Sequence, residues 1–134
     1  MSVETGMKNG VAVAPEVLVV EDEAIIRMML VDELEDAGIS VIEAESADAA
    51  LAIMRNGTAL RVVVTDVKMP GSMDGLGLAA WMRDQAPDVS IIITSGFATE
   101  PDCEGINSAI IRIIPKPYRP RDIAILVTAL LARL

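Results

Sequence analysis

The stretch RVVVTDVKMPGSMDG, residues 61–75, runs from a block of valines through an aspartate into a segment rich in glycine and proline. Residues 62–65 are three valines and a threonine, the residue types that favour a strand buried on both faces. Asp66 follows this strand directly, and the proline and glycines after it predict a loop. The stretch therefore predicts a core strand that ends on a carboxylate, a group that is rarely buried without a partner.

Length and composition predict one globular domain. The chain has 134 residues, which is enough for a single core, and 52% of them are hydrophobic. Only 2% are aromatic, so aliphatic residues and methionine must build that core. No apolar run reaches the roughly 18 residues that a membrane span needs, and the N-terminus carries no secretion signal.

Charge and cysteine content exclude several kinds of partner. A net charge of −9 gains nothing from counterion release on nucleic acid. The single cysteine excludes an internal disulfide and fits a reducing compartment. With no histidine in the chain, the sequence also argues against a zinc site. We therefore expect a cytoplasmic protein that binds neither nucleic acid nor membrane.

Apolar strands alternate with helical patterns along the chain. Continuous or nearly continuous apolar runs predict strands at 16–20, 40–44, 61–65, 90–94 and 109–114. Apolar residues recurring at helical spacing predict helices at 23–37, 47–55, 75–85 and 120–133. Repeated strand–helix alternation predicts an α/β fold, a doubly wound five-stranded parallel sheet with helices on both faces.

Two segments fit this alternation poorly. Residues 1–15 show no clear period and predict a flexible N-terminal tail, which leaves residues 16–134 as the domain. Residues 98–108 should hold a helix between the last two strands, but proline and glycine weaken it. We expect a short or mobile element there.

Polar residues stand where the predicted strands end. Glu21 and Asp22 follow the first strand, Asp66 the third, and Lys116 the fifth, while Thr94 ends the fourth. In a parallel sheet these positions share one edge, where ligands bind. Each residue alone has an ordinary structural explanation, such as a helix start or a turn. Taken together, however, carboxylates that lie so near one another repel, and this repulsion has to be relieved by a cation or by protonation.

The residue types suggest a chemistry for this edge. Carboxylate oxygens without soft ligands suit Mg²⁺. A carboxylate can attack a phosphoryl group and form an acyl phosphate, a reaction that depends on positioning and on charge neutralisation. Lys116 and the hydroxyl of Thr94 could then hold phosphoryl oxygens. The GxxxxGK[ST] pattern of an ATP-binding loop is absent from the sequence.

Four motifs resemble the receiver domain of two-component response regulators, a family of bacterial phosphoproteins. They are VLVVEDE (17–23), TDVKMPGSMDG (65–75), IIITSG (91–96) and PKPY (115–118). Their order and spacing agree with the family over about residues 16–133. The resemblance implies a flavodoxin-like strand order 2-1-3-4-5. Because no residue follows 134, the chain is similar to single-domain, chemotaxis-type regulators that lack an output domain.

The resemblance also assigns roles to residues. Asp66 would be the phosphoacceptor, and Asp22 and Asp66 would ligate Mg²⁺ together with the backbone carbonyl of Lys68. Glu21 would act through a bound water. Thr94 and Lys116 would engage the phosphoryl group. In addition, the Lys116–Pro117 peptide is expected to be cis.

Three positions are expected to set the switch and its lifetime. The family often has an aromatic residue where this chain has Ile113, so we expect the movement of Thr94 to be read out differently. Ser95 and Gly96 are the next two residues after Thr94. We hypothesise that the small Gly96 leaves water a path to the phosphoryl group, so that a bulky residue there slows hydrolysis. The alternative is that Gly96 only serves the turn.

The resemblance implies a phosphorylation-controlled receiver. A sensor histidine kinase or a histidine phosphotransfer protein would donate a phosphoryl group to Asp66 in a Mg²⁺-dependent phosphorelay. Output would be binding to a downstream protein target, or drainage of phosphoryl groups. The chain would catalyse only its own phosphorylation and dephosphorylation, and is therefore not expected to be a metabolic enzyme.

Three alternatives stay open. A Mg²⁺-dependent aspartyl-phosphate phosphatase is one, although many of those carry a second acid where this chain has Lys68. A receiver-shaped module that is never phosphorylated is another. The third is a receiver fragment of a longer transcription regulator.

The last helix adds a hypothesis of its own. Between residues 122 and 133 only Asp122, Thr128 and Arg133 are polar. A helix that is apolar nearly all round is usually buried on more than one side. We therefore hypothesise that it meets a partner or forms a homodimer. Alanine accounts for much of the remaining face, which leaves a merely bland surface as the alternative.

Overall fold

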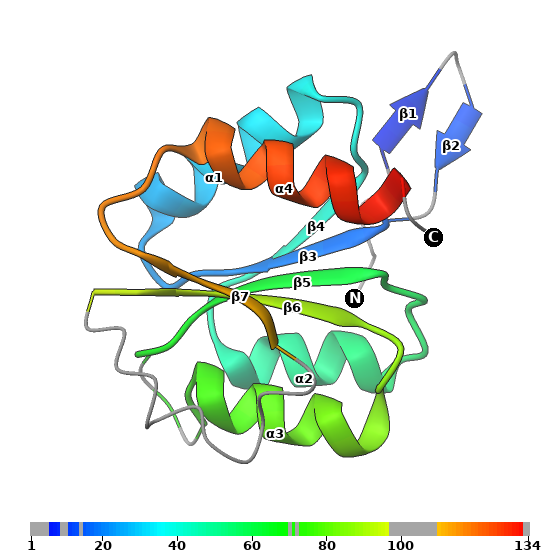
Figure 1. Ribbon diagram of the computed structural model, residues 1–134. Helices are drawn as coiled ribbons and strands as arrows, with labels where there is room; N and C mark the ends of the chain where they lie inside the picture. Colours follow the sequence, from blue (N-terminus) through cyan, green and yellow to red (C-terminus); the bar gives the residue numbers. More distant parts are fainter. Residues whose placement is uncertain are drawn as a thin grey trace.

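A computed structural model describes residues 6–8, 11–13, 15–69, 71, 73–96 and 110–132 (Figure 1). Five parallel strands form one sheet in the order β4-β3-β5-β6-β7. Their bounds are β3 Val17–Val20, β4 Val41–Ala44, β5 Val62–Asp66, β6 Ser90–Ser95 and β7 Ile110–Pro115. In order of appearance within the sheet this is 2-1-3-4-5, so the predicted doubly wound fold is confirmed.

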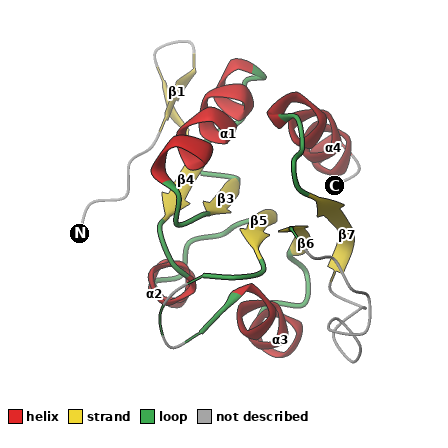
Figure 2. Ribbon diagram, turned by 90° about the vertical axis from the view of Figure 1, so that its left-hand side faces the viewer, coloured by secondary structure: helices red, strands yellow, loops and turns green. Residues whose placement is uncertain are grey.

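Helices cover both faces of the sheet (Figures 1 and 2). Helices α1 and α4 contact each other on one face, and α2 and α3 lie together on the other. Their bounds are α1 Ala24–Asp36, α2 Ala47–Arg55, α3 Gly75–Gln85 and α4 Pro120–Ala132. Among the described residues, no helix combines the length and the apolar character needed to cross a membrane.

The sheet separates two apolar clusters. One lies under α2 and α3 and includes Leu18, Val63 and Met82, all fully buried. The other lies under α1 and α4 and includes Val64 and Leu34, which are also buried. Burial of both faces explains why the central strands read as continuous apolar runs.

Side-chain caps fix where the helices on the α2–α3 face begin. The backbone N–H of Ala49 donates to the hydroxyl of Ser46, the residue before α2, over 3.0 Å. The backbone N–H of Gly77 donates to Oδ1 of Asp74, the residue before α3, over 2.9 Å. These bonds satisfy donors that a helix start would otherwise leave unpaired.

The N-terminal segment, predicted to be a flexible tail, contains two short strands. Strand β1, Gly6–Lys8, pairs antiparallel with β2, Val11–Val13. Three-residue strands are too short to show a period, which is why the sequence pattern concealed them. The intervening Asn9-Gly10 pair was the overlooked signal, because that dipeptide favours a hairpin turn. The predicted weak element at 98–108 lies outside the described residues.

Candidate functional site

The C-terminal edge of the sheet gathers the predicted site residues. Asp66 is the last residue of β5, and it stands in register with Thr94 of β6. Glu21 directly follows β3, and Lys116 directly follows β7. Residues from four strands therefore meet because parallel strands end at the same edge.

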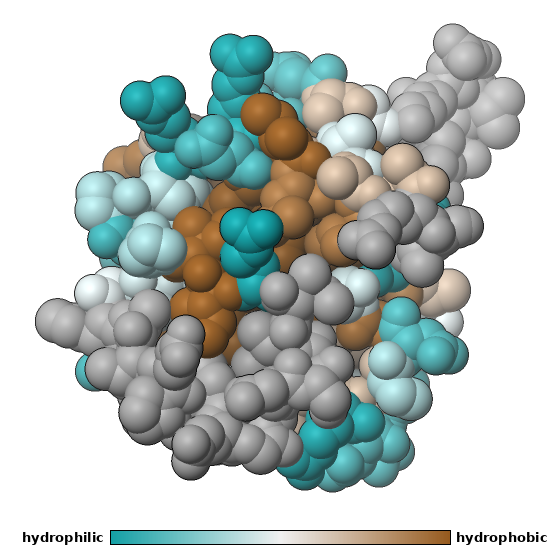
Figure 3. Space-filling view, in the orientation of Figure 1, coloured by the Kyte–Doolittle hydropathy of each residue, from teal (hydrophilic) through white to brown (hydrophobic). Residues whose placement is uncertain are grey.

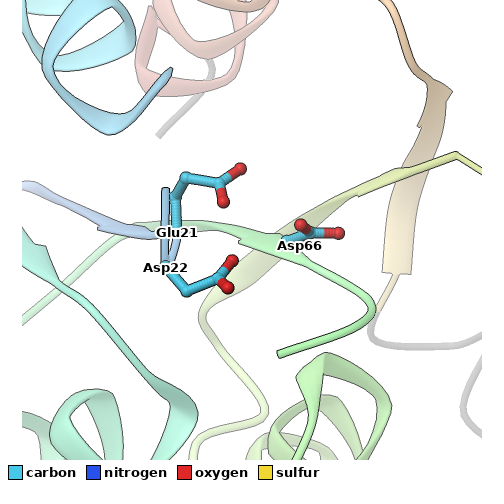
Figure 4. Close-up of side chains that lie close together, drawn as sticks. All are labelled: Glu21, Asp22 and Asp66. Atoms are coloured by element: carbon cyan, nitrogen blue, oxygen red, sulfur yellow. The ribbon is translucent and has the colours of Figure 1, made fainter. Parts of the chain in front are cut away.

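Three carboxylates form a compact group at this edge (Figure 4). One oxygen each from Glu21, Asp22 and Asp66 lies within 4.8 Å of the other two. Glu21 is 2% exposed and Asp66 is 8% exposed, whereas Asp22 faces solvent. Carboxylate oxygens so close together are the donor set of a hard divalent cation such as Mg²⁺, so the residues fit that ion.

Lys116 links two of these carboxylates. Its Nζ donates to Oδ2 of Asp66 over 2.8 Å and to Oε1 of Glu21 over 3.2 Å. Burial by itself would lower the pKa of Lys116, but the hydrogen bond and the charge of Asp66, aided by Glu21, outweigh it and raise the pKa. The ammonium therefore stays charged beside the predicted phosphoacceptor.

The Glu21 carboxyl has a raised pKa at this edge of the sheet. Burial, the largest influence, raises the pKa of its carboxyl, and the charge of Asp66 acts in the same direction. The backbone N–H of Glu23, which donates to Oε2 over 3.1 Å, and the charge of Lys116 act against this. A cation at this edge would further stabilise the charged form.

A backbone hydrogen bond joins the segment after β7 to the end of β6. The N–H of Lys116 donates to the carbonyl of Ser95 over 2.8 Å. The Lys116–Pro117 peptide is cis, as the resemblance implied. Thr94 and Ser95 are buried, whereas Gly96 is exposed and a side chain built on it would meet no atom within 4 Å.

The other predicted residues lie around this centre. Lys68 has an exposed side chain, and its carbonyl as a metal ligand stays a prediction. Ile113 is partly buried and packs against the cluster under α2 and α3. Gly71, in the loop after Asp66, has a φ of +112°, a conformation that favours glycine.

Two residues that sequence reasoning missed support the site. The N–H of Gly75 donates to the carbonyl of Val67 over 2.8 Å, and a side chain at Gly75 would overlap the carbonyl oxygen of Asp66. Arg27 donates from Nη1 to the carbonyl of Glu21 over 2.7 Å. Glycine at the first position of a helix was an available signal for Gly75, whereas no pattern pointed to Arg27.

Known proteins match this chain over most of its length. The family model described as "Response regulator receiver domain" matches residues 17–128. The sensor kinase CckA of Brucella abortus is 37% identical over 119 residues, which are 87% of this chain and 12% of that protein. The chain also spans only about half, 49%, of other curated relatives, such as PetR of Rhodobacter capsulatus.

Solved structures share the architecture. The CheY-like receiver domain protein of Methanospirillum hungatei has a TM-score of 0.81 at 25% identity, covering 90% of this chain and 96% of that one. The response regulator TrrA of Thermotoga maritima, solved with Mg²⁺ and BeF, has a TM-score of 0.75 at 28% identity. That match covers 87% of this chain and 98% of TrrA.

Proposed function

The chain belongs to the response regulator receiver domain family of two-component systems, and from this premise we propose that Asp66 accepts a phosphoryl group in a Mg²⁺-dependent phosphorelay. The donor would be a phosphohistidine on a sensor histidine kinase or a phosphotransfer protein. The output would be binding to a downstream protein, or drainage of phosphoryl groups from a relay in the cytoplasm.

One observation carries the proposal. The carboxylate of Asp66 is held at the end of a buried strand, 2.8 Å from the ammonium of Lys116 and beside two further carboxylates. A structural ion pair would need only the lysine. The two further carboxylates add repulsion that destabilises the fold and that a bound cation would relieve, which favours a binding role over a purely structural one.

The residues divide the transfer between them. An oxygen of Asp66 attacks the phosphorus, and the bond from phosphorus to the donor's imidazole nitrogen breaks, leaving an acyl phosphate on Asp66. Lys116 holds one phosphoryl oxygen, and the hydroxyl of Thr94, in register with Asp66, holds another. Asp22, Asp66 and the backbone carbonyl of Lys68 would hold Mg²⁺, with Glu21 acting through a bound water. The ion would neutralise the negative charge that accumulates on the phosphoryl oxygens. TrrA, solved with Mg²⁺ and BeF, supports this assignment by similarity.

The alternatives are less well supported. Many phosphatases that form an aspartyl-phosphate carry a general acid two residues after the nucleophile. In this chain that position is Lys68, an exposed lysine. A module that is never phosphorylated would not need the full set of charges around Asp66. Because the chain spans about half or less of its curated relatives, a role inside a longer regulator is a second candidate.

Phosphorylation by a small donor tests the proposal. Wild-type protein incubated with acetyl phosphate and Mg²⁺ should gain the mass of one phosphoryl group, and Asp66→Asn should gain none, as measured by intact mass spectrometry. Asp88→Asn is the matched control, because Asp88 is an exposed aspartate before the start of β6, at the opposite end of that strand. Chelation of Mg²⁺ should abolish labelling. Unlabelled wild type, or equal labelling of Asp66→Asn, would contradict the assignment.

A further inference from the structure

An apolar groove of about 420 Å³ opens beside the site, and its volume falls within the range of small-molecule sites. One wall comes from α1 and the other from the segment after β7. The lining residues are Ile26, Met29, Lys116, Pro117, Tyr118 and Pro120. Lys116 is the only charged residue among them.

The groove and the phosphoacceptor share Lys116. Its Nζ lies 2.8 Å from Oδ2 of Asp66, so the groove adjoins the proposed phosphoryl site. The rest of the lining is apolar apart from the phenol of Tyr118. The complementary ligand is therefore a molecule with a phosphoryl group at one end and an apolar tail at the other.

We propose that this groove receives the acyl chain of small acyl phosphates, so that the protein takes its phosphoryl group faster from longer acyl phosphates than from acetyl phosphate. The inference rests on the proposed role of Asp66 as phosphoacceptor. A carboxylate oxygen of Asp66 forms a bond to phosphorus, and the bond from phosphorus to the acyl oxygen breaks. The leaving carboxylate keeps the electron pair, and no proton has to move.

Burial of the chain sets the size of the effect. Each methylene removed from water stabilises the bound donor by an amount equivalent to about two- to fourfold in rate, depending on how completely it is covered. Butyryl phosphate has two methylenes more than acetyl phosphate. Its second-order rate constant for labelling Asp66 should therefore be about four- to sixteenfold higher.

Two methionines on α1 provide a matched test. Met29 lines the groove and is 51% exposed, whereas Met28 is 56% exposed and does not line it. Both tolerate a polar replacement of similar length, because neither belongs to the core. Initial rates of labelling with acetyl, propionyl and butyryl phosphate, at equal Mg²⁺, are followed by intact mass in Met29→Gln, Met28→Gln and wild type.

The expected result is a rate that rises with chain length in wild type and in Met28→Gln, and a much flatter rise in Met29→Gln. Equal rates for the three donors would overturn the inference while leaving Asp66 as phosphoacceptor. So would a rise that persists unchanged in Met29→Gln. Slower transfer to Met29→Gln from a phosphohistidine protein, without any chain-length effect in wild type, would assign the groove to a protein donor instead. If no acyl phosphate labels Asp66, the inference fails, and transfer from a histidine kinase decides the proposed function separately.

Discussion

Lys116 is the residue on which the charge balance of the site depends. Within the described part of the chain, its ammonium forms ion pairs with both Asp66 and Glu21. Its position was foreseen because it follows a predicted strand. What could not be foreseen is that its ammonium bridges two carboxylates, since that geometry follows from the order of strands β3, β5, β6 and β7.

Gly75 has no room for a side chain. A methyl group there would overlap the carbonyl oxygen of Asp66, which is backbone and cannot move aside cheaply. We expect Gly75→Ala to lower the free energy of unfolding by about 1–3 kcal/mol, measured by urea denaturation. Gly96→Ala is the control, because the space around Gly96 is open, and its effect should stay within about 0.5 kcal/mol. Equal stability of the two variants would refute the contact.

Tyr118 should titrate abnormally. Burial, above all, raises its pKa to about 12, and the charge of Glu21 acts in the same direction. The unfolded chain should ionise its tyrosine near 10, so between about pH 10 and 12 only the unfolded state loses the proton. The contribution of the neutral phenol to stability is thus complete below about pH 10 and is lost as the pH rises toward 12. Tyr118 is the only tyrosine, so phenolate absorbance of folded protein, compared with protein in urea, measures the shift directly. Equal titration midpoints would contradict it.

At the scale of elements, strand ends decided how much the sequence could predict. The five sheet strands were expected to within one residue at every boundary, because each is a largely buried, mostly apolar run bounded by polar or turn residues. The hairpin of β1 and β2 was missed because it has no such run. The support that Arg27 gives to the carbonyl of Glu21 was missed as well, since it joins a helix face to a loop through a single side chain.

Another arginine, Arg61, holds the end of α4 against the sheet. Arg61, just before β5, donates from Nη2 to the carbonyl of Leu131 over 2.6 Å and contacts Oε2 of Glu16 at 3.2 Å. It thereby satisfies a carbonyl at the negative end of the helix. We expect Arg61→Met to lower the free energy of unfolding by about 1–2 kcal/mol in urea denaturation. Labelling of Asp66 should be unchanged, because Arg61 lies at the opposite end of β5.

Arg121→Met is the comparison for that helix, since Arg121 is exposed on α4. Its effect on unfolding should be within about 0.5 kcal/mol. If the two variants were equally stable, the bond to the carbonyl of Leu131 would contribute nothing measurable.

On the scale of the whole molecule, α4 has one face in the core and one in solvent. It buries Ile123, Val127 and Leu130, but Ile125 is 58% exposed. Figure 3 shows apolar side chains exposed over α4. The sequence thus predicted an apolar helix, but its composition alone could not tell which residues the domain itself would cover.

Self-association through α4 is the outcome we expect for that exposed face. Light scattering should detect a dimer when beryllofluoride and Mg²⁺ mimic phosphorylation, because removal of Ile125 from water favours contact between two copies. Ile125→Glu should stay monomeric, whereas Met28→Glu, a similarly exposed position on α1, should behave as wild type. A wild-type monomer in both states that also binds no partner would contradict the hypothesis.

The contact between Gly75 and the peptide of Asp66 has an optical consequence. It seats the first turn of α3 directly on the end of β5, the strand that carries Asp66, and α3 also carries Trp81, the only tryptophan in the chain. The indole is partly buried against the cluster under α2 and α3, with the guanidinium of Arg55 6.0 Å from the ring centre. Any displacement of the Asp66 backbone would have to be accommodated by α3, the helix that carries this indole. The intrinsic fluorescence of Trp81 is therefore the signal in which we expect such a displacement to be seen, with no label required.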